Sequence, residues 1–335
     1  MLFLLGSPLF IFMHRFLFLF AVIFSSSLLF ADIKKKDFSF ELLPYFELSK
    51  GHLDEYIYSS SDDSIKKSKL QWYLNPLYKI GLGTKINLKN IFITTNADFA
   101  ISANCGTMCD SDWDSLGTIK TIYSELQEKA DLVFNSSVGL GYYFNFYDKL
   151  NRRVFYFSPL FCFDYNYFNI TSNNGHGYYG SEDYSTNGQN VSWDSEYATY
   201  HKVYGIDLER VYYNFFTGIE CNFFPTEKLS FGFNFNVSIF TKIITYDKHH
   251  FKDGWFSLNG FQQGNFEYFK ISIFSNYRFS NRMSFLLALN LLNGNLIKGD
   301  FYHNYYSSKP TLSRQKSGSS TIVVGVKAGI KILVL

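Results

Sequence analysis

Long stretches of this chain alternate large apolar residues with small or polar ones, and this alternation limits the folds open to it. The pattern is clearest in 229–239 and recurs in 132–145 and 322–334. Successive residues of a strand point to opposite faces, so each stretch would carry one apolar and one polar face. A strand buried between two packed sheets does not keep so polar a second face, whereas a membrane barrel turns apolar side chains to lipid and polar ones to a wet lumen. Aromatic residues make up 20% of a chain whose mean hydropathy is near zero, which also fits such a barrel.

Ten alternating segments can be counted, and they predict an all-β chain folded as a ten-stranded antiparallel transmembrane β-barrel with long extracellular loops. The short connections between segments lie near 147–151, 225–228 and 280–282, whereas the long polar ones span 105–129, 172–204, 247–264 and 302–318. An even number of strands places both termini on the periplasmic side. Residues 32–335 are therefore expected to form one barrel domain. Its segments are 37–58, 68–86, 88–104, 130–147, 152–171, 205–224, 228–246, 265–279, 282–301 and 319–334.

Residues 1–31 have the features of an export signal. His14 and Arg15 precede a short apolar stretch, and Ala31 offers a cleavage position before Asp32. A membrane-anchor helix is the alternative interpretation, which the shortness of the apolar stretch disfavours. The formal net charge of +2, without a basic cluster, argues against a nucleic-acid partner.

Two short motifs carry most of the chemical information. Asp110 and Asp112, like Asp247 and His249, are two residues apart, so in an extended chain each pair lies on one side of the strand. Two neighbouring carboxylates tend to share a proton, and a His beside an Asp can act as a general base near neutral pH. A water between the pairs could attack a peptide carbonyl if the fold brings the motifs together.

The strand phase supports the first motif more directly than the second. Continuing the alternation of 91–101 turns Asp110 and Asp112 toward the lumen. The alternation of 229–239 would instead turn Asp247 and His249 toward lipid. A bulge is therefore expected where that alternation breaks, and the adjacent apolar pair at 239–240 is one such place.

Each motif also has a simpler interpretation. The run Asp110, Asp112 and Asp114 could be a calcium loop or a solvated acidic loop, although Ser115 and Thr121 stand where an EF-hand loop has Gly and Glu. Asp247 and His249, taken without the first motif, would be an ordinary polar loop.

The remaining histidines and the cysteines give weaker signals. His250 could compete for the base role, but its alternation opposes that of Asp247. His176, His201 and His303 lack the spacing of metal ligands, so neither a metal nor a cofactor is expected. Cys105 and Cys109 could form a disulfide in an oxidising location or remain two thiols.

Together these motifs resemble the omptin family of outer-membrane aspartyl-type proteases. Ser68-Lys-Leu-Gln-Trp72 resembles the family's S-x-L-x-W strand, and Met108-Cys-Asp-Ser-Asp-Trp-Asp-Ser115 its M-x-D-x-D-W-x-D-S segment. Asp247-Lys-His249 resembles the family's D-x-H pair. The resemblance implies a groove above the membrane with His249 as general base and Asp247 orienting it. Asp110 and Asp112 would position the water and absorb charge.

The resemblance also implies substrate contacts. Omptins cut between basic residues, and Glu55 matches one of their pocket acids, with a solvated loop carboxylate as its alternative role. The matched Met108 is expected at the substrate site. The second pocket acid is replaced by Thr245, which predicts a weaker or altered preference for Arg and Lys.

The outer wall departs from the family as well. Phe163, Tyr165 and Tyr167 occupy the positions matching the family's lipopolysaccharide-binding residues, which argues against a dependence on that lipid. The sequence thus predicts an endopeptidase of the cell outer membrane that acts on peptides or proteins with basic residues. The competing interpretation is a non-enzymatic barrel, either a pore or an adhesin.

Overall fold

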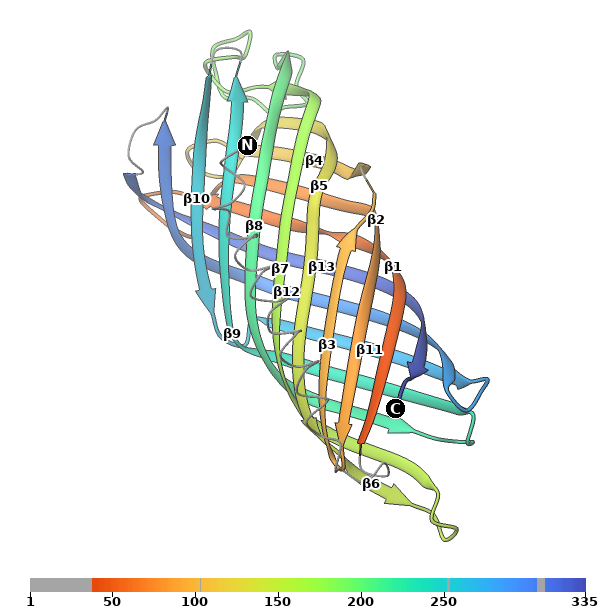
Figure 1. The fold of residues 1–335 in the computed structure, drawn as a ribbon. Coiled ribbons are helices and arrows are strands. Elements are labelled where there is room, and N and C mark those ends of the chain that lie inside the picture. The colour runs from red at the N-terminus through yellow and green to blue at the C-terminus, as the bar shows by residue number, and fades with distance from the viewer. Residues whose placement is uncertain (1–37, 103, 252–253, 306–310) are drawn as a thin grey trace, which may run out of the picture.

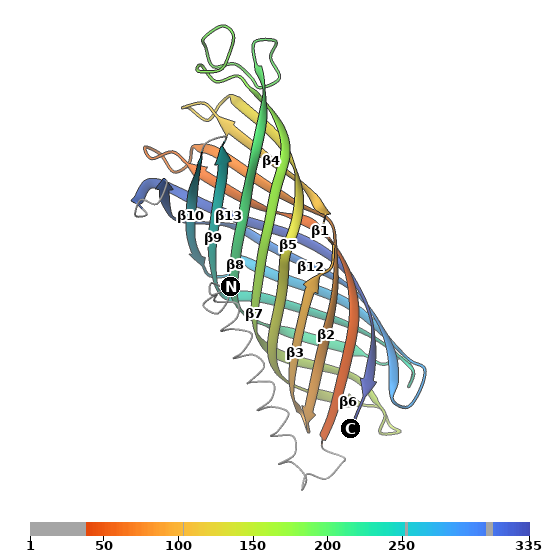
Figure 2. The same cartoon turned by 45° about the horizontal axis from the view of Figure 1, so that its top comes forward.

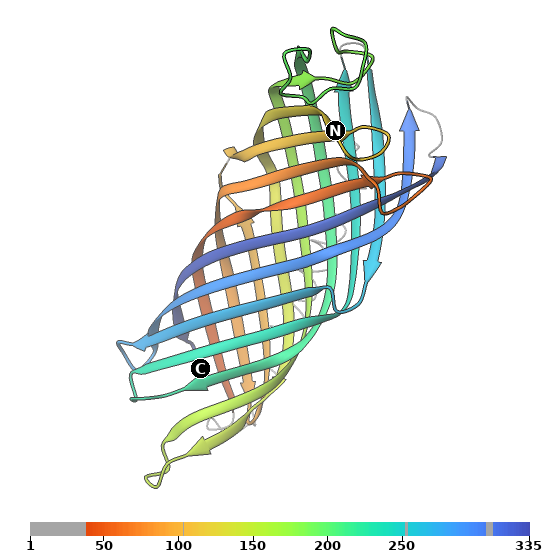
Figure 3. The ribbon, with the colours of Figure 1, turned by 180° about the vertical axis from the view of Figure 1, so that it is seen from behind.

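The chain forms a closed ring of antiparallel strands. The computed structural model describes residues 38–335 apart from 103, 252–253 and 306–310, so the expected export signal at 1–31 lies outside the described residues. Strands that are neighbours around the ring pair antiparallel, and the last strand pairs with the first. The ribbon winds around a tall, tilted cylinder (Figure 1), and the view from behind shows the first strands running beside the last (Figure 3). Among the described residues, no helix is long and apolar enough to cross a membrane.

The described residues form a ring of thirteen strands, but three interruptions divide continuous paths, so the ring contains about ten strand paths. β3 and β4 both lie between β2 and β5, β6 continues β5 alongside β7, and β10 and β11 both lie between β9 and β12. The strands are β1 (Phe38–Tyr58), β2 (Lys66–Leu88), β3 (Ile91–Ala100), β4 (Asn104–Trp113), β5 (Lys120–Tyr142), β6 (Phe144–Tyr147), β7 (Arg153–Tyr179), β8 (Thr199–Phe223), β9 (Leu229–Phe251), β10 (Gly254–Gly264), β11 (Tyr268–Arg278), β12 (Met283–Tyr305) and β13 (Thr311–Leu333).

Several segments expected to be loops are strand extensions instead. β4 and β5 occupy much of 105–129, β9 and β10 occupy nearly all of 247–264, and β12 and β13 extend into 302–318. The prediction of loops there was wrong for a physical reason. Polar side chains keep a segment out of the lipid, but its backbone can still pair with neighbouring strands above the membrane. The turn between β7 and β8 is the longest connection and stands highest on the cylinder (Figure 2).

The lower part of the cylinder has an apolar exterior and a polar interior. On β9, Phe231, Phe233 and Phe235 are exposed on the outside, whereas Ser230 and Asn236 are buried. A membrane needs only about 9–11 residues of a tilted strand, yet β7 contains 27 residues and β9 contains 23. More than half of these strands therefore extends beyond the apolar band.

The lumen is bridged by polar side chains and capped by an apolar layer. Lys85 of β2 contacts Glu220 of β8, and Lys270 of β11 contacts Asp164 of β7. Above them lies a buried apolar cluster that includes Leu53, Leu70, Trp72, Met108, Leu126, Leu208 and Ile243. The candidate site lies directly above this apolar layer.

Candidate active site at the mouth of the barrel

The first pair of carboxylates lies on β4, between β2 and β5. Asp110 pairs with Leu70 and Asp112 with Ser68, so the carboxylates are held in the register of a strand and not in a loop. Met108, which precedes them on the same face, is fully buried in the apolar layer. Asp110 and Asp112 therefore follow Met108 on the same face of β4, between the apolar layer and the mouth of the barrel.

The second pair lies on β9, and the expected bulge brings it inside. Phe215 of β8 pairs with Phe240, while Phe216 pairs with Ser238, so Ile239 is an extra residue on β9. This single insertion shifts the inward positions from even to odd numbers, as the burial of Ser238 and then Thr241 shows. The expectation of a bulge at 239–240 is confirmed.

Beyond the bulge, Asp247 and His249 form a bonded pair. His249 Nε2 lies 2.9 Å from Asp247 Oδ2, and Asp247 is buried whereas His249 keeps 18% of its side chain exposed. Phe256 of β10 stacks on the imidazole, with ring centroids 4.4 Å apart and planes 12° from parallel. The carboxylate and the ring together fix the orientation of His249 while one edge stays open to solvent.

The two pairs interact electrostatically across the mouth. Burial raises the pKa of Asp110 well above its usual range, and the nearby Asp112 carboxylate adds to the effect, while His249 opposes it. Burial also raises the pKa of Asp112. Burial by itself would lower the pKa of His249, but Asp247, followed by Asp110 and Asp112, outweighs it and raises that pKa to about 9. The β4 carboxylates and His249 therefore influence one another electrostatically across the mouth.

Two neighbouring ionisable residues, His250 and Asp114, are bonded to other partners. His250 Nε2 contacts Asp207 Oδ2 at 2.7 Å on the opposite face of β9, so the prediction that His250 opposes Asp247 is confirmed. Asp114 accepts hydrogen bonds from Thr118 and Ile119 within its own turn, which separates it from the pair on β4. Within the described part of the chain, no group of three or more His, Cys, Asp or Glu side chains is placed to hold a metal ion.

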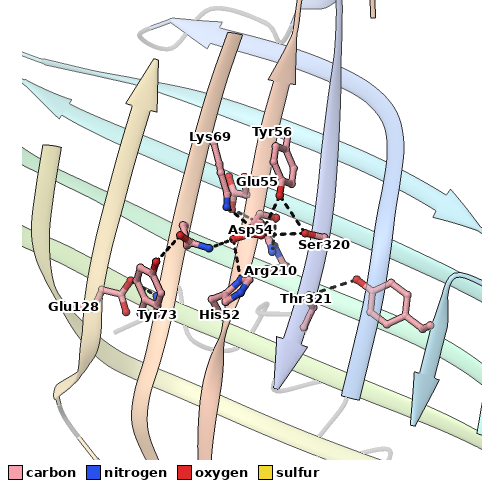
Figure 4. Close-up of polar contacts among 12 residues, drawn as sticks. His52, Asp54, Glu55, Tyr56, Lys69, Tyr73, Glu128, Arg210, Ser320 and Thr321 are labelled. Carbon is pink, nitrogen blue, oxygen red and sulfur yellow. Dashed lines mark hydrogen bonds and ion pairs between the residues drawn. The ribbon is translucent and has the colours of Figure 1, made fainter. Parts of the chain in front are cut away.

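A narrow cleft opens beside Asp247. It encloses about 30 Å³, and Glu55 and Thr245 are among the side chains that line it. Glu55 of β1 is not a free carboxylate: its Oε1 accepts a 2.6 Å contact from Nη2 of Arg210, which reaches across the lumen from β8 (Figure 4). The prediction that Glu55 binds a basic side chain of the substrate requires an unpaired carboxylate. In this structure the Glu55 carboxylate is already paired with Arg210.

The comparisons with known proteins identify the family of the chain. Residues 47–333 match the model of the Omptin family. The chain belongs to the omptin family. It is a protein of the bacterial outer membrane, and its family is one of proteases. No curated protein sequence matches the chain.

A solved structure of an outer-membrane protease shares the fold of this chain. The crystal structure of outer membrane protease OmpT from Escherichia coli matches with a TM-score of 0.76 and 14% sequence identity, over 88% of this chain and 96% of that chain. The translocator domain of autotransporter NalP from Neisseria meningitidis matches with a TM-score of 0.31 at 7% identity, over 90% of each chain. The transport unit of autotransporter AIDA-I from Escherichia coli gives 0.33 at 10% identity, over 90% of this chain and 91% of that one.

The structure also places Met108 and the two cysteines near the site. Met108 is fully buried beneath the site, where it packs in the apolar layer, and its contact with substrate stays a prediction. Cys105 and Cys109 are both free thiols, and they have different partners: Cys105 lies near Glu128 and Cys109 near Tyr123. In this structure Met108 therefore supports the site from the apolar layer below it.

Arg210 is the residue of this omptin site that the motifs did not reveal. It is fully buried, and it lies directly opposite Thr245 in the pairing of β8 with β9. The available signal was its alternation with Leu208 and Tyr212, which places a cation on the inward face of a strand. Its partner Glu55 is 155 residues away in the sequence, so no local pattern could join the two.

Proposed function

We propose that this omptin is an outer-membrane endopeptidase that hydrolyses peptide bonds with a water molecule held between His249 and the Asp110–Asp112 pair. The observation that carries the proposal is the electrostatic contact between the two motifs, which come from non-adjacent strands. Neither a metal nor a covalent intermediate enters this mechanism.

The proposed reaction begins with proton removal from water by His249. The water oxygen forms a bond to the peptide carbonyl carbon, and the carbonyl electron pair moves to its oxygen. Asp247 fixes the imidazole tautomer and stabilises the imidazolium. Burial raises the pKa of Asp110, and in its protonated form this carboxyl group donates a hydrogen bond to the developing oxyanion. His249 then returns the proton to the nitrogen as the C–N bond breaks.

Peptides or proteins that reach the cell surface are the proposed substrates. The family's preference for basic residues depends on free acids in the cleft, but Glu55 is paired with Arg210 and Thr245 replaces the second acid. Independence from lipopolysaccharide stays a prediction from the residues at 163, 165 and 167.

The competing proposal of an open pore receives less support. Opposite walls of the lumen are joined by Lys85 with Glu220, by Lys270 with Asp164 and by Arg210 with Glu55. Such contacts across the interior occupy the path that a solute would need. An adhesin would require no inward-facing Asp–His unit.

The test is cleavage of a mixture of quenched fluorescent peptides by the refolded full chain. We expect cleavage by the wild type and its loss in His249→Ala and Asp110→Ala. The matched control is His250→Ala, which removes the neighbouring imidazole on the outer face and should retain activity. Wild-type rates in both site variants would contradict the proposed residues, and an inactive wild type would contradict the proposed function.

A further inference from the structure

The cleft beside Asp247 ends on a buried ion pair. Arg210 is fully buried, and only 12% of the Glu55 side chain is exposed. The guanidinium also donates to the Asp54 carbonyl at 3.3 Å and to the Tyr212 hydroxyl at 3.2 Å, so protein atoms hold it in place. Glu55 lines the cleft, and Arg210, a fixed cation of the protein itself, compensates its charge from behind the cleft wall.

This cation changes what the cleft can bind. A basic substrate side chain seeks an unpaired acid, but the opposite charges of Glu55 and Arg210 compensate each other at 2.6 Å. To bind Glu55, an incoming Lys or Arg would have to displace Arg210 and leave a charge buried without a partner, which is strongly unfavourable. Thr245, directly opposite Arg210 in the strand pairing, contributes a hydroxyl and no charge.

The cleft is lined by polar atoms whose hydrogen-bonding capacity is unsatisfied. Four buried oxygens that line it have no hydrogen-bond partner among the described residues: Thr245 Oγ1, Asp247 Oδ1, Gln262 Oε1 and Ser319 Oγ. Buried polar groups are nearly always hydrogen-bonded in folded proteins, so an unsatisfied group in a cleft points to a ligand or to water. The two hydroxyls can donate or accept, whereas the carboxylate and amide oxygens accept.

We propose that Arg210 determines the substrate preference of this peptidase, by making the cleft select uncharged side chains that both donate and accept hydrogen bonds. A carboxamide side chain, Asn or Gln, fits this description best, because its NH₂ group can meet the acceptor oxygens and its carbonyl can meet a hydroxyl. The enclosed volume of about 30 Å³ suits a small polar head group. This inference rests on the proposed peptidase function and concerns only which peptide bonds are cut.

The experiment compares cleavage-site preferences of variants of the full chain in a mixed peptide library read by mass spectrometry. For the wild type we expect Asn or Gln beside the cut bond at least about tenfold over Arg or Lys, since sites that hydrogen-bond a substrate group discriminate strongly. Arg210→Met, which frees the Glu55 carboxylate, should shift the preference toward Arg and Lys. Glu55→Gln, which leaves Arg210 unpaired, should shift it toward Asp and Glu.

A control variant distinguishes the effect of charge at the cleft from the effect of removing any cation inside the lumen. Lys270→Met removes another cation that bridges the lumen, to Asp164, but lies outside the cleft, so the preference should not change. Folding of each variant is checked by its altered electrophoretic mobility before heating. If Arg210→Met does not assemble, the nearly isosteric Glu55→Gln decides the question.

The outcomes distinguish this inference from the function beneath it. Wild-type cleavage mainly at Arg or Lys, or a preference unchanged in both charge variants, would overturn the role of Arg210 while leaving the peptidase intact. Absence of cleavage at every peptide would overturn the peptidase itself, and this inference with it.

Discussion

Asp247 Oδ2 and His249 Nε2 lie 2.9 Å apart inside the barrel mouth, although the alternation of the first half of β9 would have turned both side chains to the outside. The extra residue Ile239 explains why the inward-facing positions differ between the two halves of β9. Below the bulge the phenylalanines face outward, and above it the same odd-numbered phase faces the lumen. A local irregularity near the membrane surface thus determines where the candidate base points.

Deletion of Ile239 should therefore inactivate the protein. The deletion restores unbroken alternation and turns Asp247 and His249 to the outer wall. Peptide cleavage by assembled protein would be measured, with Ile239→Ala as the control that keeps the extra residue and should retain activity. An assembled deletion variant with normal activity would show that the bulge does not set the phase of the site.

Asp247→Asn should lower kcat by about 10²–10⁴-fold, because an amide cannot stabilise the imidazolium or hold the required tautomer. The change is nearly isosteric, so the barrel should assemble normally. Steady-state kinetics provide the measurement, and Asp207→Asn, which alters the carboxylate paired with His250 on the outer face, is the matched control. Equal rates for Asp247→Asn and the wild type would remove Asp247 from the mechanism.

The pH dependence should follow the ionisation of His249. Asp247 and the β4 carboxylates outweigh burial and raise its pKa to about 9, and a general base must be unprotonated to act. Consequently kcat/KM for the free enzyme should rise with pH until the pH passes about 9. In Asp247→Asn the rise should move to lower pH while the maximum falls, since the main opposite charge is lost. A wild-type profile that rises near pH 6.5, the ordinary range of histidine, would contradict this electrostatic arrangement.

The sequence predicted the ring of strands and the inward direction of Asp110 and Asp112 because both depend on periodicity, whereas the joining of these aspartates with Asp247 and His249 was implied by the resemblance to the omptin family. Alternation fixes which face each residue occupies, so Asp110 and Asp112 could be placed from the phase of 91–101. Strand ends were predicted less well, since the polar stretches above the membrane continue to pair. The cross-lumen contact of Arg210 with Glu55 depends on barrel closure and on side-chain reach. Neither property is written in the local sequence around either residue.

The burial of Met108 leads to a final prediction, which separates support of the site from contact with substrate. Met108 is fully buried beside Leu70, Trp72 and Leu126, so Met108→Ala should lower the free energy of unfolding by about 2–5 kcal/mol through lost burial and a residual cavity. Met108→Leu, which conserves volume, should cost less than about 1.5 kcal/mol. Urea unfolding of the refolded barrel measures both changes. Because Met108 is not among the residues that line the cleft, KM should stay near the wild-type value in the Leu variant. A large rise in KM without loss of stability would instead indicate that Met108 contacts the substrate.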